Sequence, residues 1–114
     1  FSLAEFELCW SKKRHAREIA RVTWFGVMGL GKEDTRKRIH PTQKPVELVS
    51  WFFDKFEGDN VIDMFAGSGT TLIACEKHNR NCYAMELDPH YCDVIIKRWE
   101  DFTGQKAELL DGTL

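Results

Sequence analysis

The feature that most restricts the fold is a short β-rich run that leads directly into a glycine-rich turn. The run is Asn-Val-Ile-Asp-Met-Phe (60–65), and the turn reads Ala-Gly-Ser-Gly-Thr (66–70). The run is too short for a helix and predicts a strand. Gly67 and Gly69 let the backbone approach a ligand closely, and the first N–H groups of a following helix suit a carboxylate or phosphate. A strand, a turn and a helix in this order predict a parallel, doubly wound sheet.

The rest of the chain extends this alternation of strand and helix. Residues 71–80 predict a helix, residues 82–87 a second strand, and residues 89–102 a helix that begins at Pro89. Upstream, the alternating polar and apolar residues of "EFELCW" (5–10) predict a strand with one buried side. The predicted fold class is therefore α/β. Its sheet is incomplete, because only three strands are predicted.

A helix with an apolar stripe is predicted ahead of the turn. Pro45 suits the first helical turn because its missing N–H costs nothing there. The stripe, which we expect to be mainly core together with Trp51, consists of Val49, Phe52, Phe53 and Phe56. Gly58 is expected to close this helix. Residues 11–42 show no clear period and predict a long connecting segment.

The composition favours one small domain. Among the 114 residues, 43% are hydrophobic, which is enough to build a core. We divide the domain into residues 1–39, a strand plus a basic connecting segment, and residues 40–114, the cofactor-binding α/β part. No apolar run approaches the roughly 20 residues of a membrane helix, and no leader pattern is present, so we expect a cytoplasmic protein. Because the first residue is Phe1, the native start is expected to be missing.

The cysteines suggest a metal site only weakly. They form no CxxC pair. The candidate zinc ligands are Cys75, His78, Cys82, His90 and Cys92. Their spacings match no usual zinc-ligand pattern, and two of the cysteines fall within helical apolar patterns. We therefore expect reduced core thiols of a cytosolic protein and no metal.

Charge is distributed unevenly along the chain. Residues 1–45 hold ten Lys or Arg against five Asp or Glu, whereas residues 46–114 hold six against thirteen. The basic segment 12–38 could bind DNA, because neutralising phosphates releases counterions. The alternative is a solvated loop whose charges keep it soluble.

The acids near the turn narrow the choice of ligand. Glu86 ends the second predicted strand nineteen residues after Gly67, the spacing at which an acid binds ribose hydroxyls. The Gly-Lys-Ser/Thr of a P-loop is absent, and Leu72 replaces the third glycine of a dinucleotide fingerprint. Asp63 would repel a pyrophosphate but can accept hydrogen bonds from an ammonium group. A nucleoside that carries an amino acid fits, which favours S-adenosylmethionine. An NAD-dependent oxidoreductase fragment is the weaker alternative.

Three strings then resemble a known family. They are "IHPTQKPVELVSWFF", "VIDMFAGSGTTLIAC" and "CYAMELDPHY". They look like the carboxy-terminal, cofactor-binding half of DNA amino-methyltransferases, which use S-adenosylmethionine to methylate adenine N6 or cytosine N4. The resemblance covers residues 6–104 and is closest over residues 40–91. It implies a Rossmann-like S-adenosylmethionine-dependent methyltransferase fold.

The resemblance also implies which residues bind the methionine part of the cofactor. Its His-Pro-Thr-Gln-Lys-Pro string closes over this part of the cofactor, so Thr42, Gln43 and Lys44 would hold the carboxylate. Asp63 would meet the ammonium group, and Phe65 would pack against the cofactor.

The turn and the second strand would bind the rest of the cofactor. By resemblance, the turn is formed by Gly67, Ser68, Gly69 and Thr70. Glu86 would bind the ribose, and Leu87 would lie against the adenine.

Several of these residues have an alternative role. His40 could cap the loop before Pro41, and Phe65 could be a core residue of its strand. Asp63 could accept hydrogen bonds from the backbone of the turn, with or without a ligand role. Trp24 and Phe25 could touch a base or simply pack locally.

The stretch Asp-Pro-His-Tyr (88–91) resembles the catalytic Asp-Pro-Pro-Tyr motif of the same family but follows Glu86 directly. In the family this place belongs to the cofactor motif, so Asp88 is expected to be a structural acid at a helix start. Nothing in residues 1–39 spells the catalytic motif, which must hold the target amino group and stack on a flipped base.

We therefore expect the cofactor-binding half of a site-specific DNA methyltransferase, inactive alone. The alternative is a non-catalytic binding remnant or subunit. A homodimer or the missing amino-terminal catalytic half would cover the open sheet.

Overall fold

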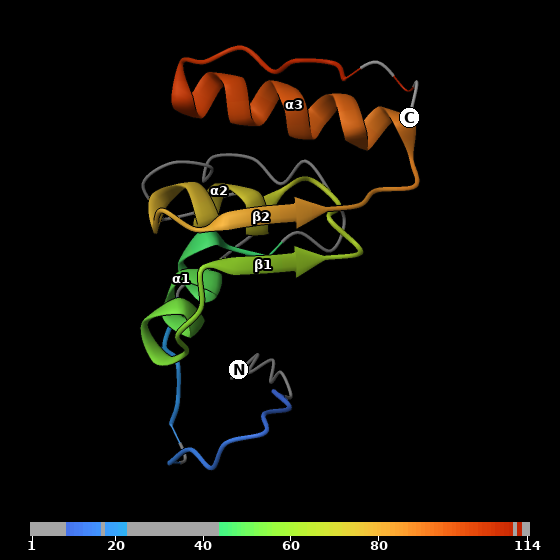
Figure 1. Cartoon of the computed structure of the whole chain (residues 1–114). Coiled ribbons are helices and arrows are strands. Elements are labelled where there is room, and N and C mark those ends of the chain that lie inside the picture. Colours follow the sequence, from blue (N-terminus) through green and yellow to red (C-terminus); the bar gives the residue numbers. More distant parts are fainter. Residues whose placement is uncertain (1–8, 17, 23–43, 111, 113–114) are drawn as a thin grey trace, which may run out of the picture.

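The computed structural model describes residues 9–16, 18–22, 44–110 and 112. Five elements follow one another, namely α1 (Val46–Lys55), β1 (Asn60–Asp63), α2 (Thr70–Lys77), β2 (Asn81–Ala84) and α3 (Pro89–Thr103). The two strands are parallel, with Asn60 opposite Asn81 and Asp63 opposite Ala84. Figure 1 shows the two strands side by side, with α2 next to β2. The predicted alternation of strand and helix is confirmed for residues 44–110.

The upstream part of the chain is only partly described. Residues 5–8 of the predicted strand 5–10 lie outside the described residues, and neither Cys9 nor Trp10 is in a strand. Of the predicted connecting segment 11–42, the described residues 11–16 and 18–22 have no helix or strand.

Helix α1 begins and ends differently from the prediction. Pro45 is its N-cap, with extended backbone (φ −70°, ψ 145°), and Phe56 at the other end is extended as well. The helix therefore stops before Gly58. The physical reason lies far along the chain, because Nη2 of Arg80 donates to the carbonyl oxygens of Phe53 and Phe56 at 2.7 and 2.8 Å. The same guanidinium lies 4.3 Å from the centre of the Phe53 ring.

The core lies between α1 and α2. Val46, Ile73 and Ala74 are buried, with Val49, Phe53 and Trp99 packed against them. Of the predicted aromatic core, Phe53 thus contributes directly. All four aromatic residues, Trp51, Phe52, Phe53 and Phe56, are half-buried.

The other face of the sheet is not covered by the described residues. Residues that alternate along a strand share a face, and Ile62 is opposite Tyr83 in the register. Ile62, Met64, Tyr83 and Met85 are 73, 63, 62 and 66% exposed. We call these four residues the open sheet face. An apolar surface of this kind normally packs against another part of a protein.

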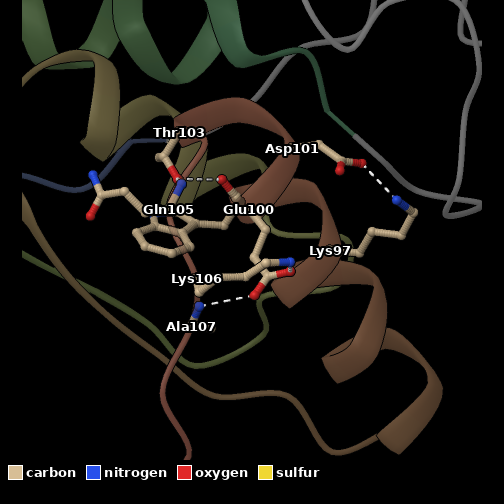
Figure 2. Close-up of polar contacts among 8 residues, drawn as sticks. Lys97, Glu100, Asp101, Thr103, Gln105, Lys106 and Ala107 are labelled. Carbon is tan, nitrogen blue, oxygen red and sulfur yellow. Dashed lines mark hydrogen bonds and ion pairs between the residues drawn. The ribbon is translucent and has the colours of Figure 1, made fainter.

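After α3 the chain turns back along the helix (Figure 2). Gly104 ends α3 with φ 71°. The Glu100 carboxylate accepts hydrogen bonds from the backbone N–H of Ala107 at 2.9 Å and from Nζ of Lys106 at 3.1 Å. These two donors lower the pKa of Glu100. They also fix the direction in which the chain leaves the helix.

All four cysteines are free thiols, and Cys75 is buried whereas Cys9 is exposed. Cys82 and Cys92 are half-buried. The prediction of core thiols therefore holds fully for Cys75 alone. Within the part of the chain that the structure describes, no helix is both long and apolar enough to cross a membrane.

Candidate functional site

The glycine-rich turn lies where β1 ends and α2 begins. Gly67 has φ 56° and Gly69 has φ 87°, conformations that favour glycine over any residue with a Cβ. Gly69 is the N-cap of α2 and donates to the carbonyl of Ala66 at 2.9 Å. The N–H of Ala66 donates to the carbonyl of Met85 at 3.0 Å, so the turn is fixed to the residues beyond β2. The start of α2 thus lies beside the carboxyl ends of both strands.

Two carboxylates lie at this edge. Oδ1 of Asp63 accepts a 2.9 Å hydrogen bond from the N–H of Phe65, which draws the chain out of the strand. Strand β1 therefore ends at Asp63 instead of at Phe65 as predicted. Strand β2 ends at Ala84, so Glu86 follows the strand instead of ending it. Its Oε2 accepts from the N–H of Gly67 at 2.7 Å, and its Oε1 from the N–H of Asp88 at 3.0 Å.

The side chains of Ser68 and Thr70 do not face the open side of the turn. They are 3% and 8% exposed, and both accept hydrogen bonds from Nη1 of Arg98 on α3. Arg98 is itself 8% exposed, and burial lowers its pKa to about 10. At neutral pH it therefore remains a cation. No local sequence signal predicts these hydrogen bonds, because Arg98 lies 30 residues from Ser68 along the chain.

The segment ahead of α1 is connected to the same turn. Oγ1 of Thr70 donates to the backbone carbonyl of Lys44 at 3.0 Å, although the side chain of Lys44 is exposed. Thr42 and Gln43 lie outside the described residues, as does His40. Lys44 is the described residue of the three that were predicted to hold a carboxylate. Its backbone carbonyl is thus hydrogen-bonded to the turn.

Two apolar side chains flank the acids. Phe65 is 87% exposed and Leu87 is 96% exposed. The alternative that Phe65 is a core residue of its strand is therefore wrong for the described part of the chain, since it follows β1 and is open to solvent.

The Asp-Pro-His-Tyr stretch forms the start of α3. Asp88 is the N-cap, and its Oδ1 accepts a 2.9 Å hydrogen bond from the N–H of His90. Pro89 is the first helical residue. The expected structural role of Asp88 at a helix start is confirmed.

A cavity lies away from this edge. It measures about 430 Å³ and is lined by α2, Trp99 and residues 106–108. It also contacts Asn81 and Cys82, at the opposite end of β2 from Glu86. The half-buried acids Asp63 and Glu86 and the glycine turn, and not this cavity, carry the groups that could bind a nucleoside.

Comparison with known proteins identifies the family. The model of the N6/N4 methyltransferase family, described as DNA methylase, matches residues 6–98. This chain belongs to the N6/N4 DNA methylase family.

Curated members of the family align with most of the chain but extend well beyond it. The type II methyltransferase M.BglI of Bacillus subtilis is 33% identical over 92 residues, covering 81% of this chain and 26% of the relative. The type II methyltransferase M.HpaI of Haemophilus parainfluenzae is 34% identical over 71 residues, covering 60% and 23%. The chain thus spans about a quarter of the length of these relatives.

Two solved structures share the fold. A putative DNA modification methylase of Thermus thermophilus, TTHA0409, was solved in complex with S-adenosyl-L-methionine. It is 38% identical with a TM-score of 0.52, covering 59% of this chain and 29% of that protein. The M1.HpyAVI complex with the same ligand is 30% identical with a TM-score of 0.56, covering 78% and 42%. The predicted Rossmann-like methyltransferase fold is confirmed, with an incomplete, two-stranded sheet in the described part of the chain.

Proposed function

We propose that this chain is the S-adenosylmethionine-binding part of a DNA methyltransferase that acts on adenine N6 or cytosine N4. The observation that carries this proposal is the meeting of the turn, Asp63 and Glu86 at one edge of a parallel sheet. The first N–H groups of α2 suit the carboxylate of the methionine part, and Asp63 suits its ammonium group. Both structural neighbours were solved with this cofactor.

Glu86 suits the ribose. Its two oxygens already accept from Gly67 and Asp88, but a carboxylate oxygen has two lone pairs and can accept a second hydrogen bond. The carboxylate is therefore held in place before the ligand arrives. Phe65 and Leu87, both exposed, offer apolar surface for the flat adenine ring.

The catalytic part of the enzyme would be supplied from outside the described residues. Asp88 caps α3, so the Asp-Pro-His-Tyr stretch that resembles the catalytic motif has a structural role. We propose that the missing amino-terminal part of the enzyme packs on the open sheet face. The amount of chain that the relatives have beyond the matched region, about three quarters of their length, is sufficient for this. A homodimer is the second way to cover that face.

DNA is the proposed macromolecular substrate. In the basic segment 12–38, Lys12, Lys13 and Arg14 are exposed and suit phosphates. If they bind DNA, the affinity of the chain for a duplex should fall steeply as salt concentration rises.

Calorimetry of residues 1–114 with S-adenosylhomocysteine and with NAD tests the proposal. We expect binding of the first and none of the second. Preference for NAD would favour an oxidoreductase fragment, and binding of neither would favour a remnant. The isolated chain should also transfer no radiolabelled methyl group to DNA, and transfer should appear when a segment with the catalytic motif is added.

A further inference from the structure

Three parts of the chain meet at one buried side chain, that of Arg98. Nη1 of Arg98 donates to the carbonyl of Ser68 at 2.9 Å, to Oγ of Ser68 at 3.2 Å and to Oγ1 of Thr70 at 3.3 Å. Thr70 in turn donates to the carbonyl of Lys44 at 3.0 Å. A single guanidinium nitrogen therefore connects α3 to the turn and, through Thr70, to the segment ahead of α1.

A turn with two glycines needs such a connection. Glycine has the largest conformational freedom of all residues, so the turn between Gly67 and Gly69 gains little stiffness from its own backbone. A ligand that binds through backbone N–H groups must find them already aligned, or the cost of ordering them is subtracted from its affinity. Hydrogen bonds from a charged donor are roughly twice as strong as neutral ones, so Arg98 is suited to hold the turn in one shape.

Electrostatics alone would not put a cation at this place. The amino-terminal end of a helix carries partial positive charge, so a buried guanidinium beside the start of α2 is unfavourable in that respect. Burial of a charge is also costly unless the charge is hydrogen-bonded. The hydrogen bonds to Ser68 and Thr70 are therefore what the protein gains from an arginine here.

We propose that Arg98 is a positioning residue that holds the turn of residues 67–70 in the shape that binds the cofactor. The inference rests on the proposed function. Arg98 acts through Ser68 and Thr70, whose side chains it holds, and does not touch the ligand itself.

Two substitutions and a matched control test the proposal. Arg98→Met removes every donor but keeps a long side chain, and Arg98→Lys keeps the charge with a shorter reach. Lys97→Met likewise replaces a cation with methionine at the neighbouring position, where the side chain is 77% exposed and pairs with Asp101 one turn further along the helix. The measurements are the dissociation constant for S-adenosylhomocysteine and amide hydrogen exchange of residues 67–70 without ligand.

We expect Arg98→Met to weaken binding by about 10-fold, Arg98→Lys to recover part of that loss, and Lys97→Met to change it by less than about 2-fold. The turn amides should exchange faster in both Arg98 variants, whereas the amides of β1 and β2 should not. A folded Arg98→Met with wild-type affinity, or turn amides that exchange at the wild-type rate, would overturn the inference alone. Should Arg98→Met fail to fold, Arg98→Lys decides by the same two measurements. A wild type that binds no S-adenosylhomocysteine would instead overturn the proposed function and this inference with it.

Discussion

Glu86 accepts a hydrogen bond of 2.7 Å from the backbone N–H of Gly67, and this contact ties the acid beyond β2 to the turn beyond β1. The same carboxylate accepts from the N–H of Asp88, at the cap of α3. One side chain thus aligns the ends of both strands and the start of a helix. Under the proposed function, Glu86 would bind the ribose from the position that these two hydrogen bonds fix.

The first prediction follows from this double role of Glu86. Glu86→Ala should weaken binding of S-adenosylhomocysteine by about 10- to 100-fold, because charge-assisted hydrogen bonds worth roughly 1.5–3 kcal/mol are lost. The affinity of Glu86→Gln should lie between those of Glu86→Ala and the wild type, since glutamine keeps one acceptor oxygen. Calorimetry measures both, with Glu108→Ala as the control at an exposed acid. Equal affinities for Glu86→Ala and wild type would show that the ribose is held elsewhere.

Gly69 gives the second prediction. It has φ +87°, and a Cβ there would lie 3.2 Å from both Cγ1 and Cγ2 of Ile95 on α3. Gly69→Ala should lower the free energy of unfolding by about 1–3 kcal/mol from backbone strain. The displacement of Ile95 should add a further loss of stability. Urea unfolding measures the loss.

Gly104 is the matched control for that experiment. It also has positive φ, at +71°, but a Cβ there would have nothing within 4 Å. Gly104→Ala should therefore show the cost of backbone strain alone. If the two substitutions cost the same, the contact with Ile95 contributes nothing. A double-mutant cycle with Ile95→Ala isolates the contact directly.

The sequence predicted the order of elements well because their signals are local. The apolar stripe of α1, the glycine turn and Pro89 each act within a few residues. The turn and Pro89 were placed correctly, whereas Phe56 of the stripe lies just beyond the end of α1. Element ends were less accurate, since side chains decide them. Asp63 ends β1 by accepting a hydrogen bond from the N–H of Phe65. Arg80 binds the carbonyls of Phe53 in α1 and of its C-cap Phe56 from 27 and 24 residues away.

The site shows the same division between local and distant causes. The spacing from Gly67 to Glu86 predicted an acid that binds ribose, and this stays a prediction. The hydrogen bond from the N–H of Gly67 to Glu86 is a separate finding of the structure. That Ser68 and Thr70 turn toward α3 could not be predicted, because their partner Arg98 is about 30 residues away and sits in an ordinary amphipathic pattern. The hydrogen bond from Thr70 to the carbonyl of Lys44 also joins residues that are distant in the sequence, so it could not be predicted either.

Cys75 provides a prediction about pH. Burial, with a smaller contribution from the neighbouring Cys82 thiol, raises the pKa of Cys75 from about 9 to about 12. The folded pKa lies above that of the unfolded chain, so this thiol favours folding below about pH 9. That contribution is lost as the pH rises toward 12.

Labelling with a maleimide at pH 8 tests this. Only the thiolate reacts, so Cys75 should be modified on the order of 1,000-fold more slowly in the native chain than in guanidinium. Cys9 is exposed and serves as the internal reference. Peptide mass spectra that show Cys75 and Cys9 labelled at the same rate would contradict the burial of Cys75.

The last prediction separates a helix cap from a catalytic acid. Asp88→Ala should lower the free energy of unfolding by about 1 kcal/mol, because the hydrogen bond to the N–H of His90 is lost. Asp88→Asn should keep most of the stability, since Asn is an equally good N-cap. Asp93→Ala is the control, because it removes the same charge from an exposed position on α3. Thermal unfolding ranks the three variants. None should alter methyl transfer by the isolated chain, which is expected to be nil throughout. Transfer by the wild-type chain that Asp88→Ala abolishes without changing the melting temperature would make Asp88 a catalytic residue instead.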